Sequence, residues 1–195
     1  MNHLDAIEKG LTSKKSPNEI ARKVYLSYPT HALIGYEDKQ YEIVNEISCH
    51  FSIPIMSIQV AGSAKTGYSF HQKTNFCPKE SDLDIAIINS SLYQKYAEIV
   101  FRLTEGYSDM SKFDRNKKGI SKANEYISNI TKGMFRPDLM PSCPERNQWF
   151  SFFYELSRKH DDLFKSINAG IYMSQIFFEY KQKNTITNYK MEKGI

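Results

Sequence analysis

The chain of 195 residues is long enough for one domain with a sizeable hydrophobic core. A hydrophobic content of 41% and a charged content of 25% are ordinary for a folded protein, which excludes global disorder. The formal net charge of +4 is mildly basic, so it permits a phosphate-bearing partner without pointing to one.

Cysteine usage and hydropathy indicate the compartment. Cys49, Cys77 and Cys143 are far apart and include no CxxC pair, which argues against a disulfide framework and against a zinc knuckle. No apolar run is long enough to span a membrane, and the first residues lack the basic and apolar regions of a signal peptide. We therefore expect no membrane contact and a reducing, cytoplasmic location.

Residues 1–40 are expected to form an arm that packs on the body of the protein. Within it, Ser16 followed by Pro17 and Glu19 is typical of a helix start, with Ser16 as the cap. The arm has too few apolar residues to fold alone, so its helices must cover another part of the chain or a partner.

Residues 41–141 are expected to hold the core. Apolar residues at spacings of three and four predict an amphipathic helix over residues 41–51. Apolar runs predict strands at residues 55–60 and 81–88, and helical spacing returns over residues 90–103.

The rest of the core is more polar. Residues 105–122 are charged and indicate a mobile loop, and residues 123–132 predict a short helix ended by a glycine. Residues 133–141 fit either a short strand or an ordered loop. Residues 142–195 show aromatic and aliphatic stripes at helical spacing, which predicts a C-terminal helical region of the same unit.

A turn at the end of the first predicted strand is suited to phosphate. Gly62 lets a ligand approach the backbone closely because it has no Cβ and tolerates positive φ. Ser63 offers a hydroxyl and a backbone N–H, and consecutive amides of this kind form an anion-binding nest. Lys65 would add a positive charge. An ordinary β-turn is the alternative interpretation of these residues taken alone.

The second strand carries a pair of carboxylates. Asp82 and Asp84 are two residues apart, so on a strand both side chains point to one face, while Leu83 and Ile85 point to the other. Neighbouring carboxylates repel, and a divalent cation relieves that repulsion. Because Mg²⁺ prefers carboxylate and phosphate oxygens with water, the pair predicts a site for Mg²⁺ (or Mn²⁺) and a nucleoside triphosphate.

Gly62-Ser63 after an apolar strand, followed by Asp82-Leu83-Asp84, resembles the signature of the DNA polymerase β-type nucleotidyltransferase superfamily. The resemblance covers about residues 41–88. It implies an α/β (α+β) nucleotidyltransferase fold, with a short mixed sheet flanked by helices and a C-terminal helical segment. Eighteen residues separate Ser63 from Asp82, more than in the compact members, and this insert is expected to form an extended loop facing phosphate.

In the resembled superfamily a third carboxylate on a neighbouring strand usually completes the metal site. Asp138 is the best candidate by its position and its apolar surroundings, although Pro137 argues against a central strand there. Asp109 and Asp114 lie in a more polar stretch and fit less well. Arg136 is expected to contact phosphate or to pair with Asp138.

The sequence thus predicts transfer of a nucleoside monophosphate from a triphosphate to an acceptor hydroxyl, with release of pyrophosphate. The acceptor is left open between protein, RNA, nucleotide and small molecule. Small stand-alone bacterial members of the superfamily are often linked to toxin–antitoxin or anti-phage systems. The alternatives are a nucleotide-binding module without turnover, and a subunit that binds a protein partner through its helical flanks.

Overall fold

A computed structural model describes residues 2–194 of the chain. The helices are α1 (His3–Thr12), α2 (Pro17–Ala21), α3 (Glu37–Phe51), α4 (Gly62–Thr66), α5 (Ser90–Leu103), α6 (Ala123–Ile130), α7 (Pro144–Lys159) and α8 (Gln175–Lys193). The strands are β1 (Ile58–Ala61), β2 (Tyr68–Ser69), β3 (Thr74–Asn75), β4 (Leu83–Ile88), β5 (Met134–Phe135) and β6 (Ile167–Tyr172). Between them lie a π-helical turn η1 (Arg22–Ser27) and short 3-10 helices η2 (His31–Leu33), η3 (Ile55–Ser57), η4 (Met110–Lys112) and η5 (Pro137–Leu139). This is the mixed α+β fold that the sequence predicts.

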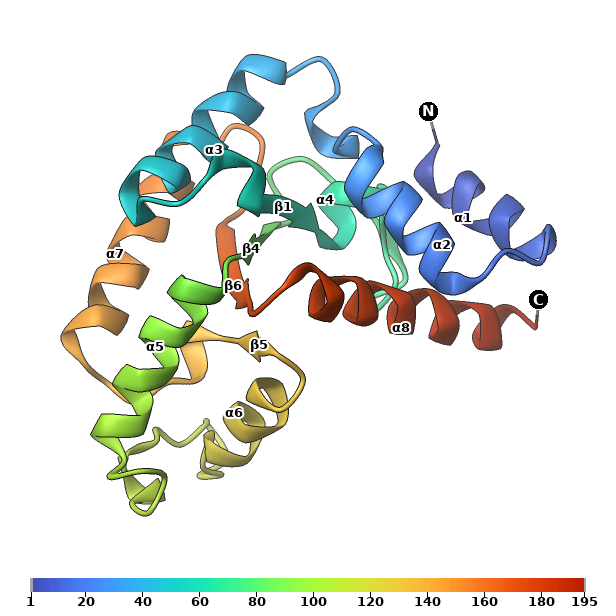
Figure 1. Cartoon of the computed structure of the whole chain (residues 1–195). Helices are drawn as coiled ribbons and strands as arrows, with labels where there is room; N and C mark the ends of the chain where they lie inside the picture. Colours follow the sequence, from blue (N-terminus) through green and yellow to red (C-terminus); the bar gives the residue numbers. More distant parts are fainter. Residues whose placement is uncertain (1, 195) are drawn as a thin grey trace.

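A four-stranded mixed sheet with the order β1-β4-β6-β5 lies at the centre (Figure 1). Strand β4 runs antiparallel to β1 and parallel to β6, and β5 pairs antiparallel with β6. The register places Asp84 opposite Ala61 on one side and opposite Asn168 on the other. The C-terminal end of β1 therefore lies beside the N-terminal ends of β4 and β6, at the same end of the sheet.

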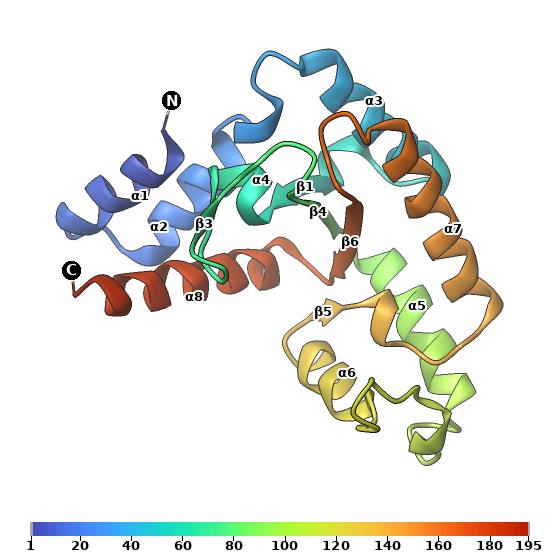
Figure 2. The same ribbon diagram turned by 180° about the vertical axis from the view of Figure 1, so that it is seen from behind.

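The two faces of the sheet are covered by different helices. Leu83, Ile85 and Ile87 pack into the larger hydrophobic core, which also contains apolar residues of α3, α5 and α7. Ala86 and Tyr172 face a second apolar cluster that includes residues of α1, α2 and α8. Figures 1 and 2 show these two groups of helices on opposite sides of the sheet. Alternation along β4 thus sends Leu83, Ile85 and Ile87 to the larger core and places Asp84 on the other face, together with Ala86.

The N-terminal arm lies against the last helix of the chain. Ser16 caps α2 as expected, since its hydroxyl accepts from the Glu19 N–H at 3.2 Å. Ile20 and Val24 are fully buried in one cluster with Phe178 of α8. The first and last segments of the sequence therefore build one wall of the molecule together.

The prediction that residues 142–195 form a helical region is wrong in part. Strand β6 interrupts the helices α7 and α8, and it lies in the interior of the sheet between β4 and β5. Ile167, Ala169 and Ile171 alternate with other residues and pack into the larger core. The spacing of four between Ile167 and Ile171 fits a helix as well as a strand, so the pattern alone favoured the wrong element.

The polar segment 105–122 is anchored at several points. Phe113 is buried, and its ring centroid lies 5.1 Å from that of Tyr126. Asp114 accepts a hydrogen bond from Arg146 of α7 at 2.6 Å. These contacts hold the segment, which was expected to be a mobile loop, against the body.

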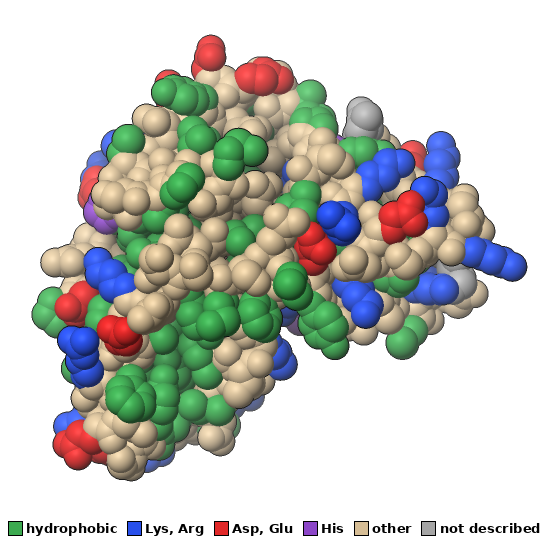
Figure 3. All heavy atoms as spheres, viewed as in Figure 1, with side chains coloured by type: hydrophobic (Ala, Val, Ile, Leu, Met, Phe, Trp, Pro, Cys, Tyr) green, Lys and Arg blue, Asp and Glu red, His purple; other side chains and the backbone are tan. Residues whose placement is uncertain are grey.

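Within residues 2–194, no helix combines the length and the apolar character needed to cross a bilayer. Some large apolar side chains are nevertheless exposed, among them Phe101 of α5 and Ile176 and Tyr180 of α8. Figure 3 shows hydrophobic side chains gathered over α5 and the neighbouring surface, whereas Lys and Arg side chains gather over the far ends of α1 and α8.

Candidate functional site

An open cavity of about 950 Å³ lies over the polar face of the sheet. Its walls come from the turn after β1, the β2–β3 hairpin, the beginnings of β4 and β6, the segment after β5, and α8. Of the residues that the sequence predicts for the site, Gly62, Ser63, Asp82, Asp84, Arg136 and Asp138 all line this cavity. Its volume is within the range of small-molecule sites.

The turn after β1 lies directly against the second carboxylate. Gly62 has a φ of +64°, and a Cβ built on it would lie 2.2 Å from Asp84 Oδ2. No side chain fits in that space, so both the backbone conformation and the close approach require glycine at this position. The pairing of Ala61 with Asp84 across the β1–β4 ladder produces this contact.

Asp82 and Asp84 lie next to each other at the start of β4. The pKa of the Asp84 carboxyl is raised to about 6, first by desolvation and then by the charge of Asp82, while the charge of Arg136 acts in the opposite direction. The Asp84 side chain is exposed to solvent in the cavity, and protein atoms surround it on its other sides. It can therefore be exposed and still be partly desolvated. Because the two carboxylates repel each other, the pair is suited to binding a cation.

Asp82 has hydrogen-bonding support from β6. The Ser166 hydroxyl donates to Asp82 Oδ1 at 2.8 Å, and Asn168 Nδ2 donates to Ser166 Oγ at the same distance. Since Leu83 pairs with Ile167, the run Ser166-Ile167-Asn168 repeats on β6 the polar–apolar–polar pattern of residues 82–84. Asp82, Asp84 and Asn168 of these two runs line the cavity, and Ser166 supports Asp82 through its hydrogen bond.

The strand next to β4 carries no third carboxylate opposite Asp84, because Asn168 occupies that position. Asp138, the expected third ligand, lies in η5 beyond β5. Within residues 2–194, no group of three or more His, Cys, Asp or Glu side chains has the arrangement of a metal site. The structure thus brings Asp82 and Asp84 together and keeps Asp138 apart from them as a ligand.

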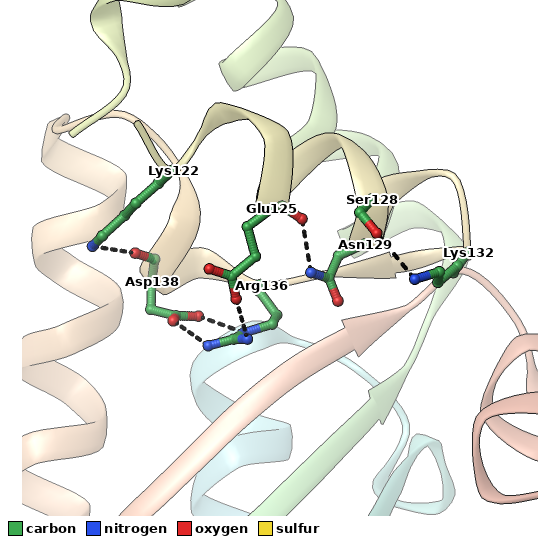
Figure 4. A network of polar contacts seen from close by, with 7 residues as sticks. All are labelled: Lys122, Glu125, Ser128, Asn129, Lys132, Arg136 and Asp138. Carbon is green, nitrogen blue, oxygen red and sulfur yellow. Dashed lines mark hydrogen bonds and ion pairs between the residues drawn. The ribbon is translucent and has the colours of Figure 1, made fainter. Parts of the chain in front are cut away.

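Asp138 instead holds Arg136 in place, as Figure 4 shows. Arg136 Nε and Nη2 donate to the two oxygens of Asp138 at 3.1 and 2.5 Å. Arg136 Nη1 donates to Glu125 at 2.9 Å, and Lys122 Nζ donates to the Asp138 carbonyl at 3.2 Å. A bidentate pair fixes the plane of the guanidinium, so Arg136 is a rigidly oriented cation at the cavity wall.

Lys65 does not line the cavity. Its ammonium donates to the Tyr28 carbonyl at 2.6 Å, and the side chain is buried, with 4% of the residue exposed. Burial lowers its pKa to about 8. The expected phosphate contact of Lys65 is therefore replaced by a structural bond to the N-terminal arm, whereas Ser63 does face the cavity.

The insert between Ser63 and Asp82 contains the rest of α4 and the β2–β3 hairpin, and part of it lines the cavity. Phe70 makes an edge contact with Tyr189 of α8, with ring centroids 5.0 Å apart. Lys73 pairs with Glu192 at 3.0 Å. These contacts attach the hairpin to the C-terminal helix, so that both form one wall.

The charges around the cavity favour a cation over a bare anion. Five carboxylates line it against three Lys and Arg side chains: Glu80, Asp82, Asp84, Asp138 and Glu192 against Arg136, Lys165 and Lys181. A triphosphate entering such a site needs accompanying cations to offset the repulsion.

The sequence interpretation missed Asn168 on β6 and Ser166, which donates to Asp82 without lining the cavity. It also missed the lining residues Tyr25, Tyr172 and Gln182. The polar–apolar–polar run at residues 166–168 is the one signal that would have identified the first two. Comparisons with family models, with curated proteins and with solved structures found no match to this chain.

Proposed function

We propose that this protein is a metal-dependent nucleotidyltransferase that moves a nucleoside monophosphate from a triphosphate to an acceptor hydroxyl. The observation that carries the proposal is the contact between Gly62 and Asp84. It places a backbone turn that a phosphate could approach closely next to the carboxylate pair, in one cavity. The acceptor class stays open between protein, RNA, nucleotide and small molecule.

The donor set fits a hard divalent cation. Asp82 and Asp84 would hold Mg²⁺ or Mn²⁺ through carboxylate oxygens, leaving the remaining positions to triphosphate oxygens and water. We leave Asp138 out of this set, because Arg136 donates to both of its oxygens and no group of three acidic ligands forms within residues 2–194. When bound, the metal neutralises the triphosphate and lowers the pKa of the attacking hydroxyl.

The chain's own groups would bind and orient the substrate. Gly62 admits a phosphate close to the backbone, Ser63 offers its hydroxyl, and Arg136 supplies a fixed positive charge at the wall. In the reaction the acceptor oxygen bonds to the α-phosphorus, the α–β bridging oxygen leaves with pyrophosphate, and the hydroxyl proton passes to solvent. Orientation by rigid groups is the main catalytic contribution expected of such a site.

A second candidate function is nucleotide binding without turnover. Asn168 in place of a third carboxylate favours it, since an amide carries no charge to balance a second cation. In this case the exposed apolar side chains of the helical flanks, such as Phe101 and Ile176, would serve a protein partner.

The proposal includes a reducing, cytoplasmic setting, which the three free cysteines support.

The test is incubation with each α-labelled nucleoside triphosphate and Mg²⁺ or Mn²⁺, with and without total RNA or cell lysate. The control is the double variant Asp82→Asn with Asp84→Asn, which keeps the side-chain volumes. Label transferred by the wild type and lost in the variant supports the enzyme. Metal-dependent triphosphate binding without transfer to any acceptor supports the second candidate.

A further inference from the structure

A polar side chain interrupts the buried stripe of α8. Phe178, Gln182, Ile186 and Tyr189 form this stripe, and Gln182 is only 5% exposed. Gln182 lines the cavity, and its amide has no hydrogen-bond partner among residues 2–194. The amide is not among the fully buried polar atoms that lack a partner, so it meets the water of the cavity, and a ligand with a donor and an acceptor can replace that water.

Two tyrosines share this property. Tyr25 and Tyr172 are 2% and 4% exposed, line the same cavity, and both make edge contacts with Phe178, with ring centroids 6.2 and 5.3 Å apart. Neither hydroxyl has a hydrogen-bond partner within residues 2–194. Burial raises the pKa of both hydroxyls, so both remain protonated donors at neutral pH.

These three groups are neutral, in contrast to the charged row at the start of β4. Tyr172 lies on β6 opposite Ile88, four residues beyond the Asp84–Asn168 pair, or about 13 Å along the strand. Between the two regions the same sheet face carries Ala86 and Gly170, which both line the cavity, and the Met134 side chain lies next to Gly170. The charges of Asp84 and Arg136 still act on the Tyr172 hydroxyl, so Tyr172 borders the charged end of the cavity, while Tyr25 and Gln182 add neutral polar groups.

We propose that Gln182, Tyr25 and Tyr172 form the subsite for the nucleobase of the triphosphate. The inference rests on the proposed function, since it assigns the part of the cavity that the phosphates and cations leave free. A nucleobase edge is neutral and offers donors and acceptors side by side, which an amide matches with its own donor and acceptor. The two hydroxyls add donors for ring nitrogens or carbonyl oxygens, and the site therefore selects among bases.

The test is calorimetric titration with ATP, GTP, CTP, UTP and inorganic tripolyphosphate, each with Mg²⁺, on the full chain. Gln182→Leu should raise the Kd of the preferred nucleotide about tenfold and reduce the preference among the four. Its Kd for tripolyphosphate should stay within about twofold of wild type, because tripolyphosphate has no base. Tyr25→Phe, which keeps the ring packing, should show the same pattern more weakly.

The matched control is Gln175→Leu, the same substitution on the solvent-facing side of α8, which should leave all five affinities unchanged. Thermal unfolding checks the fold, and Gln182→Leu should not lower the Tm because the substitution breaks no hydrogen bond within residues 2–194.

The outcomes separate this inference from the proposed function. Equal weakening of nucleotides and tripolyphosphate by Gln182→Leu, or no change in any of them, overturns the base subsite. If tripolyphosphate binds the Asp82→Asn, Asp84→Asn variant as tightly as it binds wild type, the proposed metal–phosphate site is wrong. The base subsite is then still supported if Gln182→Leu weakens the nucleotides selectively. A wild type that binds no triphosphate at all overturns both.

Discussion

Gly62→Ala is the substitution whose cost the geometry determines best. The new methyl group meets two separate obstacles. The first is the backbone, because a φ of +64° is strained for alanine by about 1–2 kcal/mol. The second is the Asp84 carboxylate, which would lie 2.2 Å from the Cβ and has to move. Displacing a packed group typically costs a further 1–3 kcal/mol or so. We therefore expect Gly62→Ala to lower the free energy of unfolding by about 3 kcal/mol.

Two further variants separate these obstacles. Gly35 has a φ of +83° and nothing within 4 Å of a built Cβ, so Gly35→Ala measures the backbone cost alone, about 1 kcal/mol. In the Asp84→Ala background the steric obstacle disappears, because the Asp84 Cβ lies at an ordinary 3.4 Å from the built atom. There Gly62→Ala should also cost about 1 kcal/mol.

The assay is urea unfolding, at one pH, of the three single variants Gly62→Ala, Gly35→Ala and Asp84→Ala and of the double variant with Gly62→Ala and Asp84→Ala. Gly62→Ala in wild type should be the most damaging substitution, and Asp84→Ala should recover most of its cost. Equal costs for Gly62→Ala and Gly35→Ala, or a cost that Asp84→Ala leaves unchanged, would refute the close contact between the turn and the carboxylate.

Four other substitutions test individual groups. Lys65, whose pKa of about 8 is below its unfolded value of 10.5, binds fewer protons when folded, so unfolding free energy should rise by about 1.5 kcal/mol from pH 8 to about pH 9.5; urea titrations should find this rise absent in Lys65→Met. The pKa of Asp84 is raised from 3.8 to about 6, so this carboxyl binds more protons in the folded state. The unfolding free energy without metal should therefore fall by about 1 kcal/mol as the pH rises from 3.8 to about 6, a value already reduced because solvent screens the carboxylate. Asp84→Asn should show no such fall in the same titration. Asp138→Asn should lower label transfer less than about tenfold without changing the Mg²⁺ concentration needed, since Asp138 orients Arg136; a raised Mg²⁺ requirement would make it a ligand. Asn168→Asp should tighten Mn²⁺ binding about tenfold in a spectroscopic titration, and no tightening would place residue 168 away from the metal.

The residues around the first two strands could be predicted because their pattern is local. Asp82 and Asp84 share a face while Leu83 and Ile85 are buried, as strict alternation on a strand requires. The glycine at position 62 was likewise predictable as a conformational requirement. Its contact with Asp84 follows from the β1–β4 pairing, which joins segments close in sequence.

Groups that depend on distant pairing were not predictable. Strand β6 joins β4 from more than 80 residues away, and its apolar spacing fits a helix equally well, so Asn168 could not be placed beside Asp84. Lys65 follows the Gly62-Ser63 turn in sequence, but its ammonium bonds to the Tyr28 carbonyl and does not line the cavity. Asp138 has the expected residue type, yet its partner is decided by the position of Arg136 across a proline turn.

The central claim is that Asp82 and Asp84 hold a divalent cation together with a triphosphate, and Mn²⁺ binding followed by electron paramagnetic resonance tests it most directly. Free Mn²⁺ would be measured against wild type and against the Asp82→Asn, Asp84→Asn variant, each with and without a triphosphate carrying a non-hydrolysable α–β bridge. We predict Mn²⁺ binding that the triphosphate strengthens in wild type and that the variant loses in both conditions. Equal Mn²⁺ binding by the two proteins, or binding that the triphosphate leaves unchanged, would contradict the account.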